Sequence, residues 1–402
     1  MGMKGFSYNI YPNNKQATRM FAIAGATRFV YNWALDFAIK YYKDNEKFIS
    51  ANDITKELTK LKKQTDTKWL NEYPNNSLKQ SAKNAANAVK NTYLSNKDNH
   101  TNNEVHFKSK YHSVPTIYLD SCQVIIDDYF VKLDKISTTK RANRGRLNYV
   151  RIQRGHKIPK GLDSYCNPTV KFIDGHWKFS VSVEVEDDIL SKVPSQTDGI
   201  GIDLGVKDLA ICSDGDLFSN ANKTNKHLKK CEKRYKQQQR KFSRQYLKNK
   251  DENNKIKYSK NMEKQRNKLK KMAVHITNIC NDYIHKTISH IVKKFPAFIS
   301  IEDLNVKGMM KNKYLARSVQ NQKFYYFRMK LTYKCERMKI PLLIVDRWYP
   351  SSKTCSKCSN IYKDLKLSDR IYNCPKCQLT IDRDFNASLN IREEGRRLLN
   401  LQ

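Results

Sequence analysis

The sequence predicts a multidomain α/β protein, and three observations lead to that prediction. The chain has 402 residues, of which 39% are hydrophobic, enough for two to four domains with cores of their own. Along the chain, helical periodicity gives way to strand alternation, and then to strands mixed with a long helical stretch. Two cysteine pairs near the end predict a separate small module.

The first half is predicted to be helical and then strand-rich. From about residue 16 to 100, apolar residues recur at helical spacing, and one such face consists of Leu78, Ala82, Ala85, Ala86, Val89 and Tyr93. From about 104 to 190 the pattern changes to strands. In "NPTVKFIDGHWKFSVSVEVE", Asp174-Gly175 predicts a hairpin turn. The return strand should bury the alternating residues Trp177, Phe179, Val181, Val183 and Val185.

The second half begins after "VPSQTD" at 193–198, which we interpret as a linker. The runs "GIGIDLG" and "DLAICSD" predict two strands, and a Lys/Arg/Gln-rich helical stretch covers about 225–295. Two more strands are expected in "FPAFISIEDLNVKGM" and in "IPLLIVD" at 340–346. After the cysteines, "IDRDFNASLNIREEGRRLL" predicts a helix.

The charge of the chain predicts a polyanionic partner. Its 76 Lys and Arg against 39 Asp and Glu give a formal net charge of +37, which would cause strong self-repulsion without such a partner. With 23 Tyr and 16 Phe available for base stacking, nucleic acid is the expected partner, and the basic helical stretch should track phosphates. No run has the ~20 apolar residues of a membrane span, and the first residues lack a secretory signal. We therefore expect a cytoplasmic protein.

The ten cysteines fall into two groups. "CSKC" (Cys355, Cys358) and "CPKC" (Cys374, Cys377) have the spacing of a structural zinc site, in which four thiolates leave no open coordination position. The other six are scattered singly. In a reducing compartment they are most simply interpreted as small buried apolar residues: Cys122, Cys166, Cys212, Cys231, Cys280 and Cys335.

Carboxylates end or open several of the predicted elements. Asp203 lies in the first apolar strand, Glu302 and Asp303 end a later one, and Asp382 and Asp384 open the last helix. An ionised carboxylate costs several kcal/mol to bury unless a cation or hydrogen bonds compensate it. Helix capping is the simplest role for either of the last two Asp residues taken alone. Together, one acid from each element could hold two Mg²⁺ ions for phosphodiester hydrolysis, and the glycines beside Asp203 would let a nucleic-acid backbone approach.

In several motifs the chain resembles TnpB, a transposon-encoded family related to type V CRISPR nucleases. The motifs are "GIDLGVKDLA", "IEDLNVKGM" and "SSKTCSKC…CPKCQLTIDRDFNASLNI", together with the early "IYPNNKQ" and "GATRFVYNWAL". Ser359 and Gln378 stand where the family usually has glycine, and Ser388 replaces an alanine, so altered knuckle turns and helix packing are expected.

The resemblance implies a RuvC/RNase H-like nuclease domain with an inserted four-cysteine zinc module, an N-terminal helical recognition lobe and an oligonucleotide-binding β-barrel. The expected division of the chain is 1–15 first barrel strand, 16–103 helical recognition domain, 104–192 rest of the barrel, 193–347 first part of the nuclease domain, 348–378 zinc module, and 379–402 C-terminal nuclease helix.

The resemblance also implies a function. The protein would be a Mg²⁺-dependent, RNA-guided DNA endonuclease that binds a guide RNA from the transposon end and cuts double-stranded DNA beside a short target-adjacent motif, as a monomeric ribonucleoprotein of a bacterial or archaeal cell. Asp203, Glu302 and Asp384 would be its catalytic magnesium ligands. From their positions beside the cysteine pairs, Lys353 and Arg370 are candidate phosphate contacts.

Two other functions are compatible with parts of this pattern. A nuclease-inactive, RNA-guided DNA-binding repressor should have lost at least one of the three acids, and all three are present. A DNA-strand-transfer transposase also uses an acidic triad on this type of fold, and would join DNA ends without a guide RNA.

Overall fold

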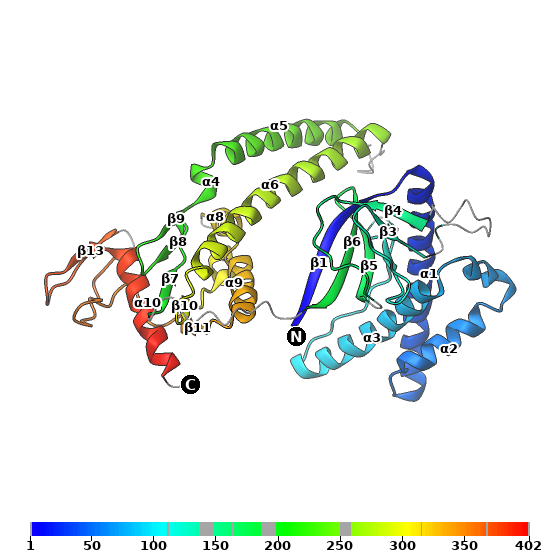
Figure 1. Cartoon of the computed structure of the whole chain (residues 1–402), viewed down its shortest axis with the longest axis horizontal. Helices are drawn as coiled ribbons and strands as arrows, with labels where there is room; N and C mark the ends of the chain where they lie inside the picture. The colour runs from blue at the N-terminus through cyan, green and yellow to red at the C-terminus, as the bar shows by residue number, and fades with distance from the viewer. Residues whose placement is uncertain are drawn as a thin grey trace. The chain divides into compact units, whose positions relative to one another are not determined.

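A computed structural model shows the chain as two compact units, residues 1–186 and 187–402 (Figure 1). The structure describes residues 2–110, 112–134, 136, 148–162, 165–185, 198–249, 259–314, 316–366 and 369–400. Most of the predicted linker, 193–197, lies outside them. Among the described residues, no helix is both long and apolar enough to cross a bilayer.

The first unit combines a six-stranded antiparallel sheet with a group of helices. The strand order is β2-β5-β6-β1-β4-β3. The elements are β1 Gly2–Tyr11, α1 Asn14–Asn45, α2 Ala51–Leu61, the 3₁₀ helix η1 Thr65–Glu72, α3 Asn75–Asn99, β2 Thr116–Tyr118, β3 Phe130–Lys132, β4 Tyr149–Ile152, β5 Cys166–Ile173 and β6 His176–Val185.

The predicted hairpin and barrel are present in this unit. Asp174 and Gly175 have φ of 56° and 80°, the left-handed pair that a two-residue hairpin turn requires. Alternate residues of β6 are buried, as predicted, from Trp177 to Val183. One hydrophobic core contains residues from all six strands, including the edge strands β2 and β3, so the sheet curls around it as a barrel.

The helices of the first unit have a core of their own. The predicted apolar face of α3 is buried from Leu78 to Val89 and packs on α1 and α2, while Tyr93 is partly buried at its edge. Asn13 caps α1 by accepting a hydrogen bond from the Gln16 backbone N–H, and the Gln16 side chain accepts one from the Asn13 N–H in return. This reciprocal cap explains why α1 begins directly after β1.

The second unit contains a five-stranded sheet of order β11-β10-β7-β8-β9, in which β11, β10 and β7 are parallel. Its elements are β7 Ile200–Asp203, β8 Asp208–Cys212, β9 Leu217–Ser219, α4 Ala221–Thr224, α5 Lys226–Lys248, α6 Lys260–Val292, β10 Ile299–Glu302, α7 Val306–Lys311, α8 Ala316–Gln322, α9 Phe324–Met338, β11 Leu342–Val345, β12 Ile371–Asn373, β13 Thr380–Asp382 and α10 Arg383–Leu399. The predicted helical stretch at 225–295 therefore contains the long helices α5 and α6, which pack on each other.

Helices cover both faces of the second sheet (Figure 1). One core joins Ile200 and Ile202 of β7 and Ile299 and Ile301 of β10 to apolar residues of α6 and α9. On the other face, α10 contacts β7, β10, β11 and β8. The intervening residues of β7 and β10 therefore face α10, because successive side chains of a strand point to opposite faces.

Candidate active site and metal centre

The position of Asp203 follows from the packing of β7. Ile200 and Ile202 are buried against α6 and α9, so Gly201 and Asp203 belong to the face that α10 covers. Gly201 lies directly under the helix, and Asp203 follows at the carboxyl end of the strand. In a parallel sheet this end is the usual place for a binding site.

The parallel neighbour β10 places a second acid beside the first. Ser300 is paired with Gly201 and Ile301 with Ile202. Extending this register by one residue puts Glu302 next to Asp203. Ser300 shows which face this is, because its hydroxyl donates a 2.9 Å hydrogen bond to the Ile391 carbonyl of α10.

The third acid comes from the start of α10. Asp382 is the N-cap of this helix, and its side chain accepts hydrogen bonds from the backbone N–H groups of Asp384 and Phe385 at 2.9 and 3.0 Å. The capping role expected for Asp382 is therefore confirmed. Asp384 lies in the first turn, where Arg383 donates to its Oδ1 at 2.7 and 3.0 Å and Arg370 lies 3.6 Å from its Oδ2.

Asp384 and Glu302 are near enough to Asp203 for their charges to affect its pKa. The pKa of Asp203 is raised from 3.8 to about 7, chiefly by burial and further by the negative charges of Asp384 and Glu302. The positive charge of Arg383 opposes this increase. Burial and the neighbouring Asp303 raise the pKa of Glu302. The site thus holds more negative charge than its arginines balance. Such a donor set fits a divalent cation, which prefers carboxylate oxygens.

This charge imbalance predicts how the stability of the Mg²⁺-free protein depends on pH. The native state keeps a proton on Asp203 up to about pH 7, whereas the unfolded chain releases it near 3.8. The free energy of unfolding should therefore fall as the pH rises from about 4 to about 7, by at most ~4 kcal/mol from this group. In Mg²⁺-free buffer, Asp203→Asn should match the native sequence in stability near pH 4 and should exceed it by a growing margin up to about pH 7, as measured by urea unfolding. Equal pH dependence in the two proteins would contradict the assignment.

Asp303, the residue after Glu302, has a different environment. Arg328 and Arg347 both form ion pairs with its carboxylate, and their hydrogen bonds hold its pKa below the usual range. Its charge is therefore already balanced by two cations. This distinguishes it from Glu302, whose pKa is raised.

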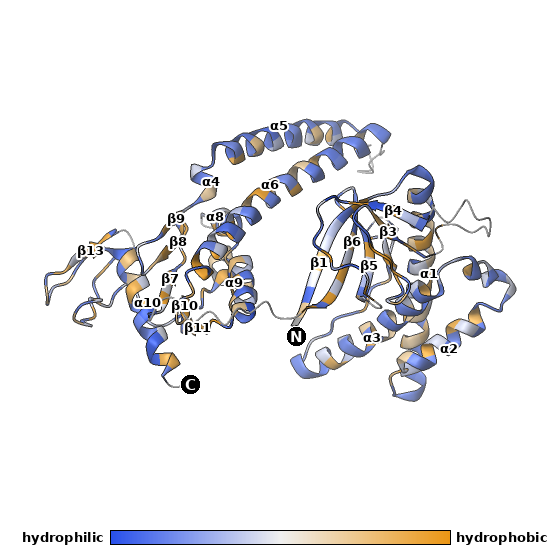
Figure 2. Cartoon of the chain, in the orientation of Figure 1, coloured by the Kyte–Doolittle hydropathy of each residue, from blue (hydrophilic) through white to orange (hydrophobic). Residues whose placement is uncertain are grey.

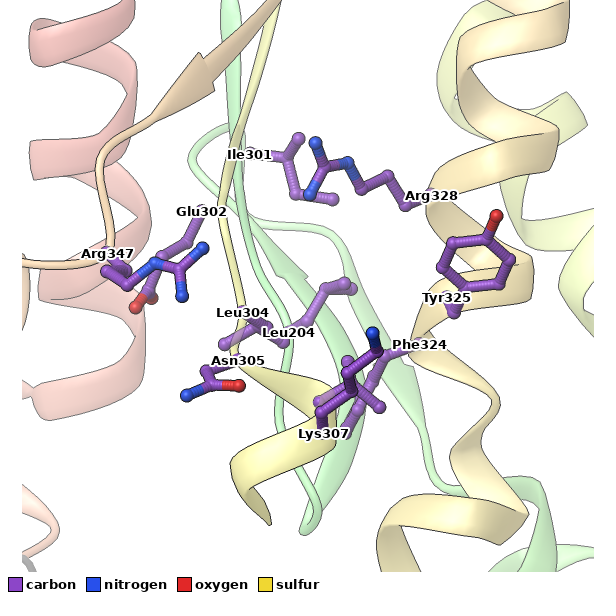
Figure 3. A pocket seen from close by; sticks show the side chains of 11 residues that line it. Leu204, Ile301, Glu302, Leu304, Asn305, Lys307, Phe324, Tyr325, Arg328 and Arg347 are labelled. Atoms are coloured by element: carbon purple, nitrogen blue, oxygen red, sulfur yellow. The ribbon is translucent and has the colours of Figure 1, made fainter. Parts of the chain in front are cut away.

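A cavity of about 250 Å³ lies beside Glu302 (Figure 3). Leu204, Leu304 and Phe324 supply apolar walls, while cationic side chains come from Arg347 near Glu302 and from Arg328 on α9 across the cavity. Tyr325, 73% exposed, stands beside Arg328. Apolar walls with cations at the rim suit a nucleotide, which has a flat base and a charged phosphate.

The four patterned cysteines form a metal-binding group. The sulfurs of Cys355, Cys358, Cys374 and Cys377 all lie within 4.8 Å of one another. Two of the S···S separations are 3.5 and 3.6 Å, close to the ~3.8 Å edge of a tetrahedron with Zn–S bonds of ~2.3 Å. Burial alone would raise the pKa of Cys374, but hydrogen bonds from backbone N–H groups and from neighbouring thiols lower it to about 6. The group can hold a zinc ion, as predicted.

The departures from the family pattern have visible consequences in the structure. Ser359 and Gln378, which follow the two cysteine pairs, have φ of 58° and 57°. This left-handed conformation favours glycine, so both knuckle turns carry a modest strain. Ser388 is fully buried in α10, and its hydroxyl donates to the Phe385 carbonyl at 2.7 Å, so the extra oxygen is accommodated.

Two buried asparagines connect the cysteine module to α10. Asn386 and Asn390 both donate to the Thr354 carbonyl, at 2.7 and 2.6 Å, and Asn390 also donates to the Ser351 carbonyl at 2.7 Å. Asn386 in turn accepts from the Ser356 backbone N–H. The loop that carries Cys355 is therefore held against the helix that carries Asp384.

Some expectations from the sequence are wrong or incomplete. A Cβ on Gly201 would lie 2.2 Å from the Ser388 carbonyl oxygen, so α10 fills the space beside this glycine. The glycine therefore allows a helix to approach the strand, and not nucleic acid as expected.

Arg383, which donates hydrogen bonds to the Asp384 carboxylate, was not identified from the sequence. Its signal was an arginine between two aspartates in "DRD", which would otherwise repel each other at the helix start.

The scattered cysteines are only partly as expected. Cys212, Cys280 and Cys335 are buried, but Cys122 and Cys166 are exposed and Cys231 is of intermediate exposure.

The two candidate phosphate contacts have different surroundings. Arg370 is exposed beside Asp384, while the Lys353 amine donates a hydrogen bond to the Lys363 carbonyl within the cysteine module.

Family profiles match three parts of the chain. Residues 180–313 match a family described as "Probable transposase", and 324–391 match "Cas12f1-like, TNB domain". Residues 1–47 match a family described as "Helix-turn-helix domain", although the structure has the strand β1 and the single long helix α1 there. Residues 1–47 contain β1 and α1, and residues 324–391 contain the four patterned cysteines and Asp384.

Relatives and a solved structure match nearly the whole chain. The chain is 27% identical to "Putative RNA-guided DNA endonuclease" of Streptomyces pristinaespiralis, over 98% of this chain and 89% of that protein. It is 28% identical to "Putative RNA-guided DNA endonuclease InsQ" of Escherichia coli K12, over 99% and 93%. The fold is similar to that in "Cryo-EM structure of the Cas12f1-sgRNA-target DNA complex", with a TM-score of 0.58 and 14% identity over 94% of this chain and 82% of that one.

Proposed function

We propose that this chain, which belongs to the TnpB family of transposon-encoded proteins, is an RNA-guided DNA endonuclease with one RuvC-like active site. It would bind a guide RNA from the transposon end and cut double-stranded DNA next to a short adjacent motif, acting on nucleoid DNA of a bacterial or archaeal cell. The observation that supports the proposal is that Asp203 and Glu302 end neighbouring parallel strands, and that Asp384, in the first turn of α10, is near enough for its charge to raise the pKa of Asp203.

The three acids would hold two Mg²⁺ ions, which when bound activate a water and stabilise the leaving oxygen of the phosphodiester. The chain's own groups position these acids. Arg383 holds the Asp384 carboxylate from one side, and the Asp382 cap fixes the helix start from which it projects. The hydrogen bond from Ser300 to Ile391 keeps β10, and with it Glu302, against the same helix.

The surroundings of the site suit a DNA strand. Lys307, Arg328 and Arg347 line the cavity beside Glu302 and could attract phosphates. Tyr325 and Trp348, 73% and 84% exposed, offer faces on which bases can stack. We propose Arg370 as a further phosphate contact, because it is exposed and only 3.6 Å from Asp384. Lys353 is proposed for the same role on the cysteine module.

The domain division expected from the sequence is part of the proposal. The barrel (1–15 and 104–192) and the helical domain (16–103) would grip the guide RNA and the heteroduplex. The nuclease domain (193–347 and 379–402) would cut the DNA, and the zinc module (348–378) would support the nuclease domain.

Figure 2 shows that α5 is hydrophilic over most of its length. The helix contains ten Lys or Arg residues and a single acid, so it can follow a phosphate backbone.

Sequencing the RNA that co-purifies with the protein tests the guiding role. We expect a discrete species that carries sequence from the end of the transposable element, and the reconstituted complex should cut a plasmid only at sites that match the guide. Random host RNA, with cutting that ignores the guide, would refute the proposal. A strand-transfer assay separates the transposase alternative, which predicts joined DNA ends without RNA.

The cysteine module should need zinc for its fold. We propose that one Zn²⁺ is bound by the four thiolates, and because a structural site's binding energy is folding energy, Cys374→Ser should lower the zinc content by one ion per chain and the stability by several kcal/mol. Elemental analysis and thermal unfolding measure both changes. Cys122→Ser, at an exposed cysteine outside the group, is the matched control and should change neither. Unchanged zinc content in Cys374→Ser would contradict the assignment.

A further inference from the structure

Two histidines and a cysteine meet between α5 and α6, apart from both sites described above. His227 and Cys231 lie one turn apart on α5, and His275 faces them from α6. One possible ligand atom from each residue lies within 4.8 Å of the other two. The Cys231 sulfur is 3.6 Å from Nε2 of His227, and the two imidazole rings are nearly perpendicular, at 87°, with centroids 6.0 Å apart.

This geometry suits a transition metal. The i, i+4 spacing of His227 and Cys231 puts both side chains on one face of α5. In a tetrahedral zinc site with Zn–S of ~2.3 Å and Zn–N of ~2.0 Å, sulfur and nitrogen are separated by about 3.5 Å. The observed 3.6 Å from Cys231 to His227 agrees with that value. Two imidazoles and a thiolate are also the donor types that zinc prefers among divalent cations.

The exposure of these residues gives a second argument. Cys231 was expected to be a small buried residue, but it is of intermediate exposure, and both histidines are exposed. Their proximity is therefore not a product of core packing. Arg and Lys residues are frequent along α5, and an imidazole and a thiol one turn apart are unlike the rest of this helix.

We propose that His227, Cys231 and His275 bind one Zn²⁺ ion, with water as the fourth ligand, and that the ion fastens α5 to α6. This proposal does not depend on the nuclease function. The thiolate is the one anionic ligand of the three. Because the surrounding helix is strongly basic, Cys231 must supply most of the electrostatic attraction for the cation, so its loss should weaken binding more than the loss of either histidine.

The test counts zinc in the full-length protein and measures the affinity of the second ion. With the four-cysteine site already loaded, the native sequence should bind one further Zn²⁺ in competition with a chromophoric chelator. Cys231→Ser should weaken this binding at least 100-fold, and His275→Asn at least 10-fold. Cys166→Ser and His176→Asn, at an exposed cysteine and histidine of the first unit, are matched controls and should bind it normally.

A second measurement needs no variant. Zn²⁺ should protect the Cys231 thiol of the native sequence from alkylation by iodoacetamide, followed by peptide mass spectrometry, while Cys166 is alkylated equally with and without zinc. The proposal is overturned if the native sequence binds no second ion, if Cys231→Ser binds it as tightly as the native sequence does, or if zinc leaves the alkylation of Cys231 unchanged.

Discussion

Replacing Asp203 by Asn should abolish DNA cleavage while leaving guide RNA and target binding intact. The substitution keeps the shape of the side chain but removes the charge that, with Glu302 and Asp384, would hold the two metal ions. The cleavage rate should fall at least ~10³-fold, which corresponds to about 4 kcal/mol of activation free energy. Glu302→Gln and Asp384→Asn should behave in the same way. Plasmid cleavage with Mg²⁺ and a gel-shift assay on the same preparations measure cutting and binding.

A neighbouring acid provides the control. Asp382 caps α10 two residues before Asp384, so Asp382→Ala should cost about 1 kcal/mol of stability and keep much of the activity. Near-normal cutting by Asp203→Asn would refute the triad. Loss of both cutting and binding would mean instead that Asp203 has a structural role, although the raised pKa of its carboxyl predicts that the neutral amide is well tolerated.

Gly201→Ala should damage the nuclease unit severely, although it adds one methyl group. The new Cβ would lie 2.2 Å from the Ser388 carbonyl oxygen and 2.5 Å from the Arg392 backbone nitrogen. Both contacts are to the backbone of α10, so the whole helix must move, and Asp384 must move with it. We expect a loss of about 3 kcal/mol in stability and a large loss of cleavage. Urea unfolding and plasmid cleavage measure the two effects.

Gly5 provides a matched control for this variant. It is also a glycine inside a strand, β1, but a Cβ there would meet nothing within 4 Å. Gly5→Ala should therefore leave stability and cleavage nearly unchanged. If Gly201→Ala were as stable and active as Gly5→Ala, α10 would not be seated on β7 as the structure has it.

Local pattern predicted the parts of the site that lie within one element. The alternation of β7, with isoleucines on one face and Asp203 on the other, is visible in "GIGID", and the spacing of the cysteine pairs is itself the zinc pattern. What lies opposite an element could not be predicted. The space at Gly201 is filled by residues almost two hundred positions later, and the His227, Cys231 and His275 group requires the pairing of α5 with α6. Such contacts depend on tertiary packing, which one-dimensional periodicity does not contain.

The spacing of the three acids along the chain has a consequence during synthesis. Asp203 and Asp384 are 181 positions apart (384 − 203), with Glu302 between them. Until the ribosome has made α10, the face of the sheet at Gly201 and Ser300 has no covering helix and the third carboxylate does not exist. Contacts this distant in sequence also form late in folding. If the three acids form the active site as proposed, a nascent chain would therefore be unable to cut DNA until α10 has been made and has packed on the sheet.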